Sequence, residues 1–248
     1  EKCLSGYFPK NYSDSLERKY LKTDYLIASS MDYTILDDNI GYLRCESFQR
    51  GIGAGNRGDI LLYFQPCKAI IIDIRNNGGG ALTNAEELAA RFTNKEILVG
   101  YMQHKTGKGH NDFSAMKEQT LKPGKGIRWQ KPVVVLTNRS VFSAANEFVK
   151  YMRCCPNVQT VGDRTGGGSG LPFSSELPNG WSVRFSACPM YDKDKVLTEF
   201  GIDPDYKINL TDADFQQGKD TIIEFARRIL SKHDKQTPIT NHAKAYKE

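Results

Sequence analysis

The run KAIIIDI, residues 68–74, constrains the fold more than any other stretch of the sequence. Its consecutive apolar residues leave no polar face, which is typical of a strand buried on both sides of a parallel sheet. Three further runs predict strands, at residues 40–48, 96–102 and 131–138. Helical patterns follow at 82–92, where Thr83 and Glu86 predict a capping box, and at 144–152. The alternation predicts an α/β fold with a largely parallel sheet and helices packed on it.

The length and the pattern of the sequence predict one main domain. A chain of 248 residues can bury one sizeable core. Residues 1–39 are polar and weakly periodic, so we expect a peripheral N-terminal segment. The core is expected at 40–231, with a β-hairpin at the Asn-Gly pair 179–180 and a last amphipathic helix at 220–230. Residues 232–248 are expected to form a mobile polar tail.

Charge and composition argue against several classes of protein. The 34 basic and 29 acidic residues give a net charge of +5, and the two signs are interspersed, so no nucleic-acid partner is expected. No apolar run approaches the roughly 18 residues that cross a bilayer, so membrane insertion is not expected either. The six cysteines include no C-x-x-C pair, so the sequence does not suggest a zinc site. The oligomeric state does not follow from the sequence.

The stretch GAGNRG, residues 53–58, matches the G-x-G-x-x-G pattern of dinucleotide-binding folds. Such a site needs a helix that begins at once and runs for several turns. Pro66 ends the following apolar run too early for this. A flexible loop is therefore the favoured interpretation.

The stretch DIRNNGGG, residues 73–80, places two Asn and three Gly between a buried strand and a helix. Glycines leave main-chain N–H groups exposed, and the nearby helix N-terminus favours a negative charge. The segment therefore suits an oxyanion hole. A tight turn that needs positive φ explains the same residues.

Ser143, in NRSVFSAANEFVKYM, stands where a predicted strand turns into a helix. A serine there presents its Oγ close to unpaired amides, which suits a nucleophile. A helix N-cap serine is the competing interpretation, since serine is a preferred N-cap residue.

The motifs DIRNNGGG, VVVLTNRSVFSAANEF, VGDRTGGGSG…LPNGW and EFGIDPDYKI, in this order, resemble the S41 serine peptidases. That family includes the C-terminal processing proteases and the tricorn core protease, and the tricorn-type bacterial branch is most similar. The resemblance covers about residues 40–212. It implies a ClpP/crotonase-like spiral of β-β-α units and peptide-bond hydrolysis without a metal or cofactor.

The resemblance also implies roles for individual residues. Ser143 matches the nucleophile, and the amides of Ala144 and Gly79 match the two oxyanion donors. Four further glycines are expected to line the substrate site: Gly78, Gly80, Gly167 and Gly168.

The general base is not evident from the sequence. Processing proteases use a lysine in an FGKG motif, but the equivalent position here is Gly168, so a Ser–Lys dyad is not supported. Tricorn-type members use a histidine together with a glutamate, which Glu199 matches.

Four histidines are present: His104, His110, His233 and His242. The last two lie in or beside the polar tail. His110 is the candidate base, because it lies in a glycine-bearing loop among polar neighbours that could fix its tautomer. Alternatively, the base belongs to an N-terminal helical or PDZ region of the family that residues 1–40 do not match.

Three functions therefore remain open. The first is a serine peptidase that cuts unfolded or C-terminally presented polypeptides through a Ser143 acyl-enzyme. The second is a non-catalytic peptide- or ligand-binding module on the same scaffold. The third, a crotonase-like thioester enzyme, is disfavoured by Ser143. The resemblance also implies a periplasmic or cell-surface location.

Overall fold

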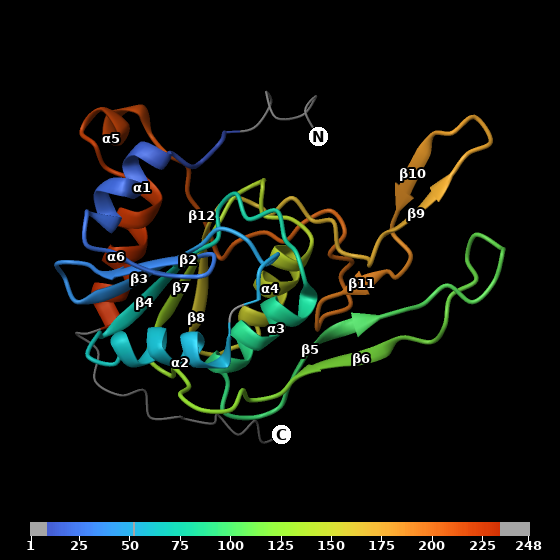
Figure 1. The fold of residues 1–248 in the computed structure, drawn as a ribbon, viewed down its shortest axis with the longest axis horizontal. Helices are drawn as coiled ribbons and strands as arrows, with labels where there is room; N and C mark the ends of the chain where they lie inside the picture. Colours follow the sequence, from blue (N-terminus) through green and yellow to red (C-terminus); the bar gives the residue numbers. More distant parts are fainter. Residues whose placement is uncertain (1–8, 52, 234–248) are drawn as a thin grey trace, which may run out of the picture.

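A seven-stranded, mostly parallel sheet forms the centre of the computed structural model, which describes residues 9–51 and 53–233 (Figure 1). Its strands, in spatial order, are β1 (Leu26–Ala28), β2 (Met31–Ile35), β3 (Ile40–Cys45), β4 (Ala69–Asp73), β7 (Val133–Thr137), β8 (Val158–Gly162) and β12 (Tyr206–Lys207). The strands from β3 to β12 pair in parallel, whereas β1, β2 and β3 pair antiparallel. The predicted α/β class and largely parallel sheet are confirmed.

Helices cover both faces of this sheet. On one face lie α2 (Ala54–Tyr63), α3 (Leu82–Ala89) with the short 3-10 helix η1 (Ala90–Phe92), and α4 (Ala144–Met152). On the other face lie α1 (Asp14–Leu21) and α6 (Thr221–His233). None of the helices among the described residues combines the length and hydrophobicity that a membrane-crossing segment needs.

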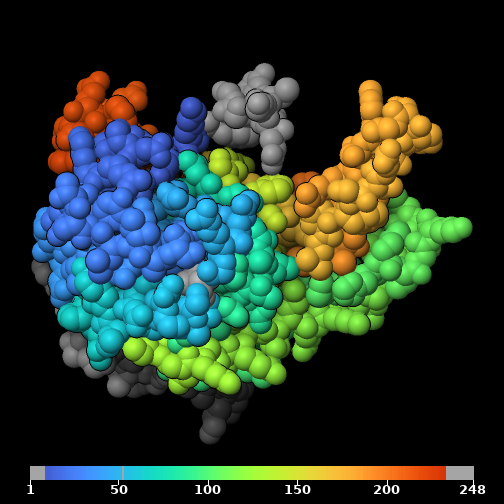
Figure 2. Space-filling view, viewed as in Figure 1, coloured from blue at the N-terminus to red at the C-terminus, as the bar shows by residue number. Residues whose placement is uncertain are grey.

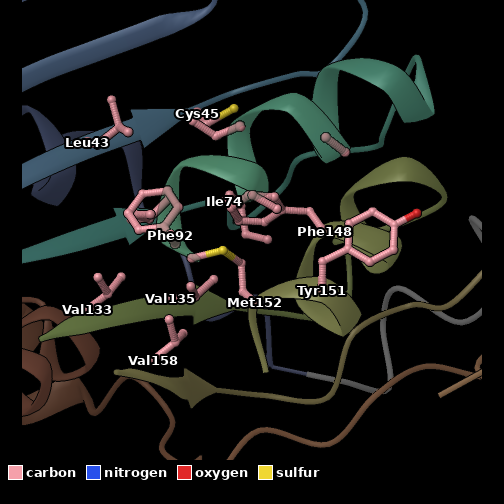
Figure 3. Packing of buried hydrophobic residues seen from close by; sticks show 14 of the residues in the cluster. Leu43, Cys45, Ile74, Phe92, Val133, Val135, Phe148, Tyr151, Met152 and Val158 are labelled. Atoms are coloured by element: carbon pink, nitrogen blue, oxygen red, sulfur yellow. The ribbon is translucent and has the colours of Figure 1, made fainter. Parts of the chain in front are cut away.

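The apolar run of β4 supplies both cores, as its sequence predicts. Ile70 and Ile72 belong to the cluster under α2, α3 and α4, while Ile71 belongs to the cluster under α1 and α6. Figure 3 shows Phe148 and Met152 of α4 packed near the strands in the first cluster. Each such fully buried side chain contributes roughly 1.5–3 kcal/mol of hydrophobic stabilisation.

Two smaller sheets lie beside the main body. One is antiparallel, in the order β11 (Met190–Tyr191), β5 (Ile97–Met102) and β6 (Lys117–Leu121). Residues 96–102 therefore form a strand as predicted, but outside the parallel sheet. The other is the predicted hairpin of β9 (Phe173–Glu176) and β10 (Ser182–Phe185), which projects from the body (Figure 2). A short helix, α5 (Asp212–Gln216), precedes α6.

The N-terminal part of the chain is less peripheral than its composition predicts. Residues 14–35 form α1, β1 and β2, and β2 pairs with β3 along its whole length. Leu16, Leu21 and Met31 are almost completely buried. Widely spaced apolar residues in a polar stretch give a weak periodic signal, yet they suffice to pack one face of a helix and of an edge hairpin.

Two local predictions are wrong. Residues 54–58 do not form a flexible loop but the first turns of α2, because Ile60 and Leu61 anchor that helix in the core. At α3 the N-cap is Ala81 and no side chain caps the helix, so Thr83 lies inside the first turn rather than before it. The tail beyond residue 233 lies outside the described residues.

Arg75 ties the end of β4 to both ends of the described chain. Its fully buried guanidinium contacts Asp73 (2.6 Å, Nη2 to Oδ2), Asp220 (2.8 Å, Nη1 to Oδ2) and the main-chain oxygen of Asn11 (3.2 Å). Burial alone would raise the pKa of Asp73, but the adjacent Arg75 outweighs it and the pKa is lowered. Asp220 also accepts the amides of Ile222 and Ile223 at the start of α6.

We predict that Asp220→Ala lowers the free energy of unfolding by about 3–5 kcal/mol, because it leaves Arg75 buried with fewer partners and removes the helix cap. Urea denaturation followed by tryptophan fluorescence measures this. Asp194→Ala is the matched control, since the pair of Asp194 with Lys193 is exposed and its loss should not shift the midpoint. An unchanged midpoint for Asp220→Ala would contradict this role.

Candidate active site

Ser143 lies between β7 and α4 with a strained backbone, at φ 57° and ψ −124°. A residue other than glycine in such a conformation costs about 1–3 kcal/mol and persists only where its surroundings impose it. Here its N–H donates to the oxygen of Gly167 at 2.8 Å, and the N–H of Phe142 donates to the oxygen of Asn77 at 3.0 Å. Ser143 occupies the N-cap position, but its side chain caps no helix amide. The N-cap interpretation therefore does not account for its hydroxyl.

The turn at residues 76–80 packs directly on Ser143. A Cβ at Gly79 would lie 2.8 Å from the Cβ of Ser143 and 2.7 Å from the oxygen of Phe142, and Gly79 has φ +99°. Only glycine fits there. The tight-turn interpretation of DIRNNGGG is therefore correct, and that same turn brings its amides next to the serine.

The amide of Ala144 has no hydrogen-bond acceptor among the described residues, which suits an oxyanion donor. The amide of Gly79 differs from the prediction, because it donates to Oδ1 of Asn77 at 2.9 Å. In this conformation Gly79 is not a free donor. The amide of Gly80 has no acceptor in the described part of the chain, and Gly80 lies in the same hollow as Ser143 and Ala144.

The hollow at Ser143 has a volume of about 290 Å³. It is lined by residues of the turn after β4, the starts of α3 and α4, the glycine loop that leads from β8 to β9, and the strands β10 and β11. These residues are Gly80, Leu82, Ser143, Ala144, Glu147, Gly168, Ser169, Gly170, Leu171, Pro172, Arg184 and Met190. Of the substrate-site glycines predicted from the resemblance, Gly80 and Gly168 line this hollow, whereas Gly78 and Gly167 do not.

Gly167 and Gly168 form a loop that main-chain hydrogen bonds anchor at both residues. The oxygen of Gly167 holds the amide of Ser143, and the amide of Gly168 donates to the oxygen of Glu199 at 2.8 Å. Gly168 has φ +73°, and a Cβ there would overlap the ring of Phe142. A lysine at this position, as in a Ser–Lys dyad, is therefore sterically excluded while Phe142 is in place.

Glu147 lies one turn below Ser143 and was not predicted from the sequence. Its carboxylate accepts from Ser169 Oγ at 2.6 Å and pairs with Lys150 Nζ at 2.5 Å, and both charged side chains are 1% exposed. Lys150 in turn donates to Gln119 at 2.8 Å. In the sequence, the one sign of this ion pair is that Glu147 and Lys150 stand three residues apart in a mostly apolar helical segment.

Glu199 lies behind the rim of the hollow. Its Oε1 accepts from Ser186 Oγ at 2.8 Å, and its Oε2 is 3.0 Å from where a Cβ of Gly170 would lie. Glu199 therefore approaches the glycine loop but is not one of the lining residues.

The prediction of His110 as the base is not supported. His110 is exposed in the loop between β5 and β6, its Nδ1 contacts Asn111 at 2.9 Å, and it does not line the hollow. The long β5–β6 hairpin holds its tip away from α4 (Figure 1). His104 instead lies 3.3 Å from the thiol of Cys188, whose pKa burial raises. His242 lies outside the described residues.

Comparison with known proteins matches this chain to one peptidase family. The family model described as Peptidase family S41 matches residues 39–208. The carboxy-terminal processing protease CtpA of Bacillus subtilis is 25% identical over 195 residues, which cover 77% of this chain and 40% of that protein. A CtpA-like serine protease of Staphylococcus epidermidis is 26% identical, and the match covers 37% of it. The chain thus spans well under half the length of these curated relatives.

Solved structures agree with this match. A protein from Parabacteroides merdae that is provisionally named a peptidase is 50% identical, with a TM-score of 0.90 over 93% of this chain and 74% of that one. Mature CPAF in complex with lactacystin has a TM-score of 0.71 at 15% identity, which supports the fold alone.

We predict that Gly168→Ala lowers the free energy of unfolding by about 2–5 kcal/mol, because it combines a left-handed φ with a clash against Phe142. Chemical denaturation measures the change. Gly58→Ala is the matched control: its Cβ meets no atom within 4 Å inside α2, so it should stabilise by up to about 1 kcal/mol. Equal effects of the two substitutions would contradict the packing described for the glycine loop.

Proposed function

The chain belongs to peptidase family S41, and from this membership we propose that it hydrolyses peptide bonds through an acyl-enzyme on Ser143. The observation on which the proposal rests is the backbone of Ser143, strained at φ 57° with a side chain that caps nothing. Strain of this kind at the start of a helix is the arrangement that exposes a nucleophile.

In the proposed reaction, Ser143 Oγ attacks the scissile carbonyl carbon while its proton passes to a base. The carbonyl oxygen becomes an oxyanion that the Ala144 amide can bind. The second donor is the Gly80 amide, which is unpaired in the described chain, or the Gly79 amide once it leaves Asn77. The C–N bond then breaks, and the leaving amine takes the proton. Water attacks the ester that remains and releases the acid and the free serine.

The base itself is proposed to lie outside the hollow as described, because no histidine or lysine is among its lining residues. Glu199 is proposed to orient that base, since its carboxylate already accepts from Ser186 beside the glycine loop. The oxygen of Lys10 accepts from Asn138 Nδ2 at 2.9 Å, so the described N-terminal segment is held at the end of β7.

The substrates we propose are unfolded or C-terminally presented polypeptides. The support is the similarity to CtpA of Bacillus subtilis, whose name describes carboxy-terminal processing. For the same reason we propose an extracytoplasmic location.

A peptide-binding module without catalysis is the second candidate. The missing proton acceptor within the hollow favours it, because an unactivated serine would leave a groove that still binds extended chain.

We predict that a fluorophosphonate probe labels Ser143, because an activated serine reacts with it and an idle one does not. Mass spectrometry of the tryptic peptides locates the label. Ser143→Ala should abolish labelling, whereas Ser140→Ala, at an exposed serine three residues earlier, should retain it. The absence of label on folded protein would reject the peptidase and leave the binding module.

A further inference from the structure

Arg184 is the one basic side chain among the described residues that line the hollow at Ser143. It lies on β10, opposite Ser174 of β9 in the hairpin register, and it is exposed. No hydrogen bond or ion pair joins its guanidinium to another described residue. An arginine that faces a cleft without a partner is suited to bind an anion supplied from outside.

The charges around the hollow leave that guanidinium uncompensated. Glu147, the one acidic lining residue, is already neutralised by Lys150 and hydrogen-bonded to Ser169. Glu199, just behind the rim, accepts from Ser186 and forms no ion pair with Arg184. A ligand in this hollow therefore meets one unpaired positive charge.

The apolar residues of the lining indicate which kind of side chain the ligand carries next to its anionic group. Leu82, Leu171 and Met190 provide apolar surface around Ser143. The hairpin that holds Arg184 is stiffened by an edge-to-face contact between Phe173 and Phe185, whose ring centroids are 4.1 Å apart. Successive residues of a strand point to opposite faces, so Arg184 and Phe185 face opposite sides of the hairpin.

We propose that Arg184 determines specificity by pairing with a carboxylate of the bound peptide, next to apolar side chains that fill the hollow. This inference rests on the proposed function, because it makes the hollow the place where the scissile bond lies. The carboxylate is either the C-terminal α-carboxylate or an Asp or Glu side chain. Both offer the two oxygens that a guanidinium binds in a fork.

The test measures binding rather than turnover, so that it does not depend on catalysis. Four peptides that carry the same uncharged BODIPY fluorophore at their N-terminus are titrated with the Ser143→Ala protein and followed by fluorescence anisotropy. Leu-Ala-Leu-Leu is used as the free acid and as the C-terminal amide. Leu-Asp-Leu-Leu amide is compared with Leu-Asn-Leu-Leu amide. The first pair tests the α-carboxylate and the second an acidic side chain.

We predict that one carboxylate peptide binds about tenfold more tightly than its neutral counterpart, and that Arg184→Gln removes this preference while leaving the affinity for the neutral peptide unchanged. Arg184→Glu should reverse the preference, and Arg184→Lys should retain part of it. Sodium chloride at about 0.5 M should weaken it, because the guanidinium is exposed.

Lys117→Gln is the charge-matched control, since Lys117 is an exposed strand cation that does not line the hollow. It should leave all four affinities unchanged, and circular dichroism confirms that each variant is folded. Equal binding of acid and neutral peptides, an unchanged preference in Arg184→Gln, or no binding of any peptide overturns the proposal. If instead fluorophosphonate labelling fails while the Arg184-dependent preference persists, the peptidase is rejected and carboxylate recognition stands.

Discussion

Ser143 keeps its strained backbone because glycine segments close on it from two sides, and the strand order places them there. β4, β7 and β8 are neighbours in the parallel sheet, so the segments that follow them meet at one edge. In such sheets that edge is where ligands bind. The turn at Gly79 touches the Cβ of Ser143 from the β4 side, and Gly167 holds its amide from the β8 side. A side chain at Gly79 would push the serine away from the amides it needs.

The turn after β4, which packs against Ser143, is fixed in place by the contacts of Arg75. Arg75 connects the end of β4 with Asp220 at the start of α6 through a buried ion pair, and with the main-chain oxygen of Asn11 through a hydrogen bond. Breaking such a buried network leaves an unpaired charge, so its members depend on one another. The N-terminal and C-terminal helices thus support the site from the opposite face of the sheet. This explains why the polar segment before β3 is part of the fold rather than an accessory.

The sequence predicts those elements whose structure is determined by residues close together in the chain. The strand at KAIIIDI, the helix after Ser143 and the hairpin at residues 179–180 follow from periodicity and turn chemistry within a few residues. The burial of Glu147 depends on its contact with Ser169, which only the folded chain brings next to α4. The bond from the Gly79 amide to Asn77 is local, but the sequence does not show which acceptor that amide takes. The polar neighbours of His110 suit a catalytic loop, but they are equally typical of the exposed tip of a hairpin, where the structure places this histidine.

The contact between Gly168 and Phe142 limits which catalytic arrangement this chain can adopt. A lysine stem at position 168 would need the space that the aromatic ring fills, and the left-handed backbone there also disfavours any side chain. The amine of Lys150, further along α4, is already paired with Glu147 of the same helix and donates to Gln119 of β6. A proton acceptor therefore has to approach Ser143 from the open side of the hollow. On that side lie the glycine loop and the hairpin with Arg184, so the elements that would admit a peptide are also those beside which a base would have to stand.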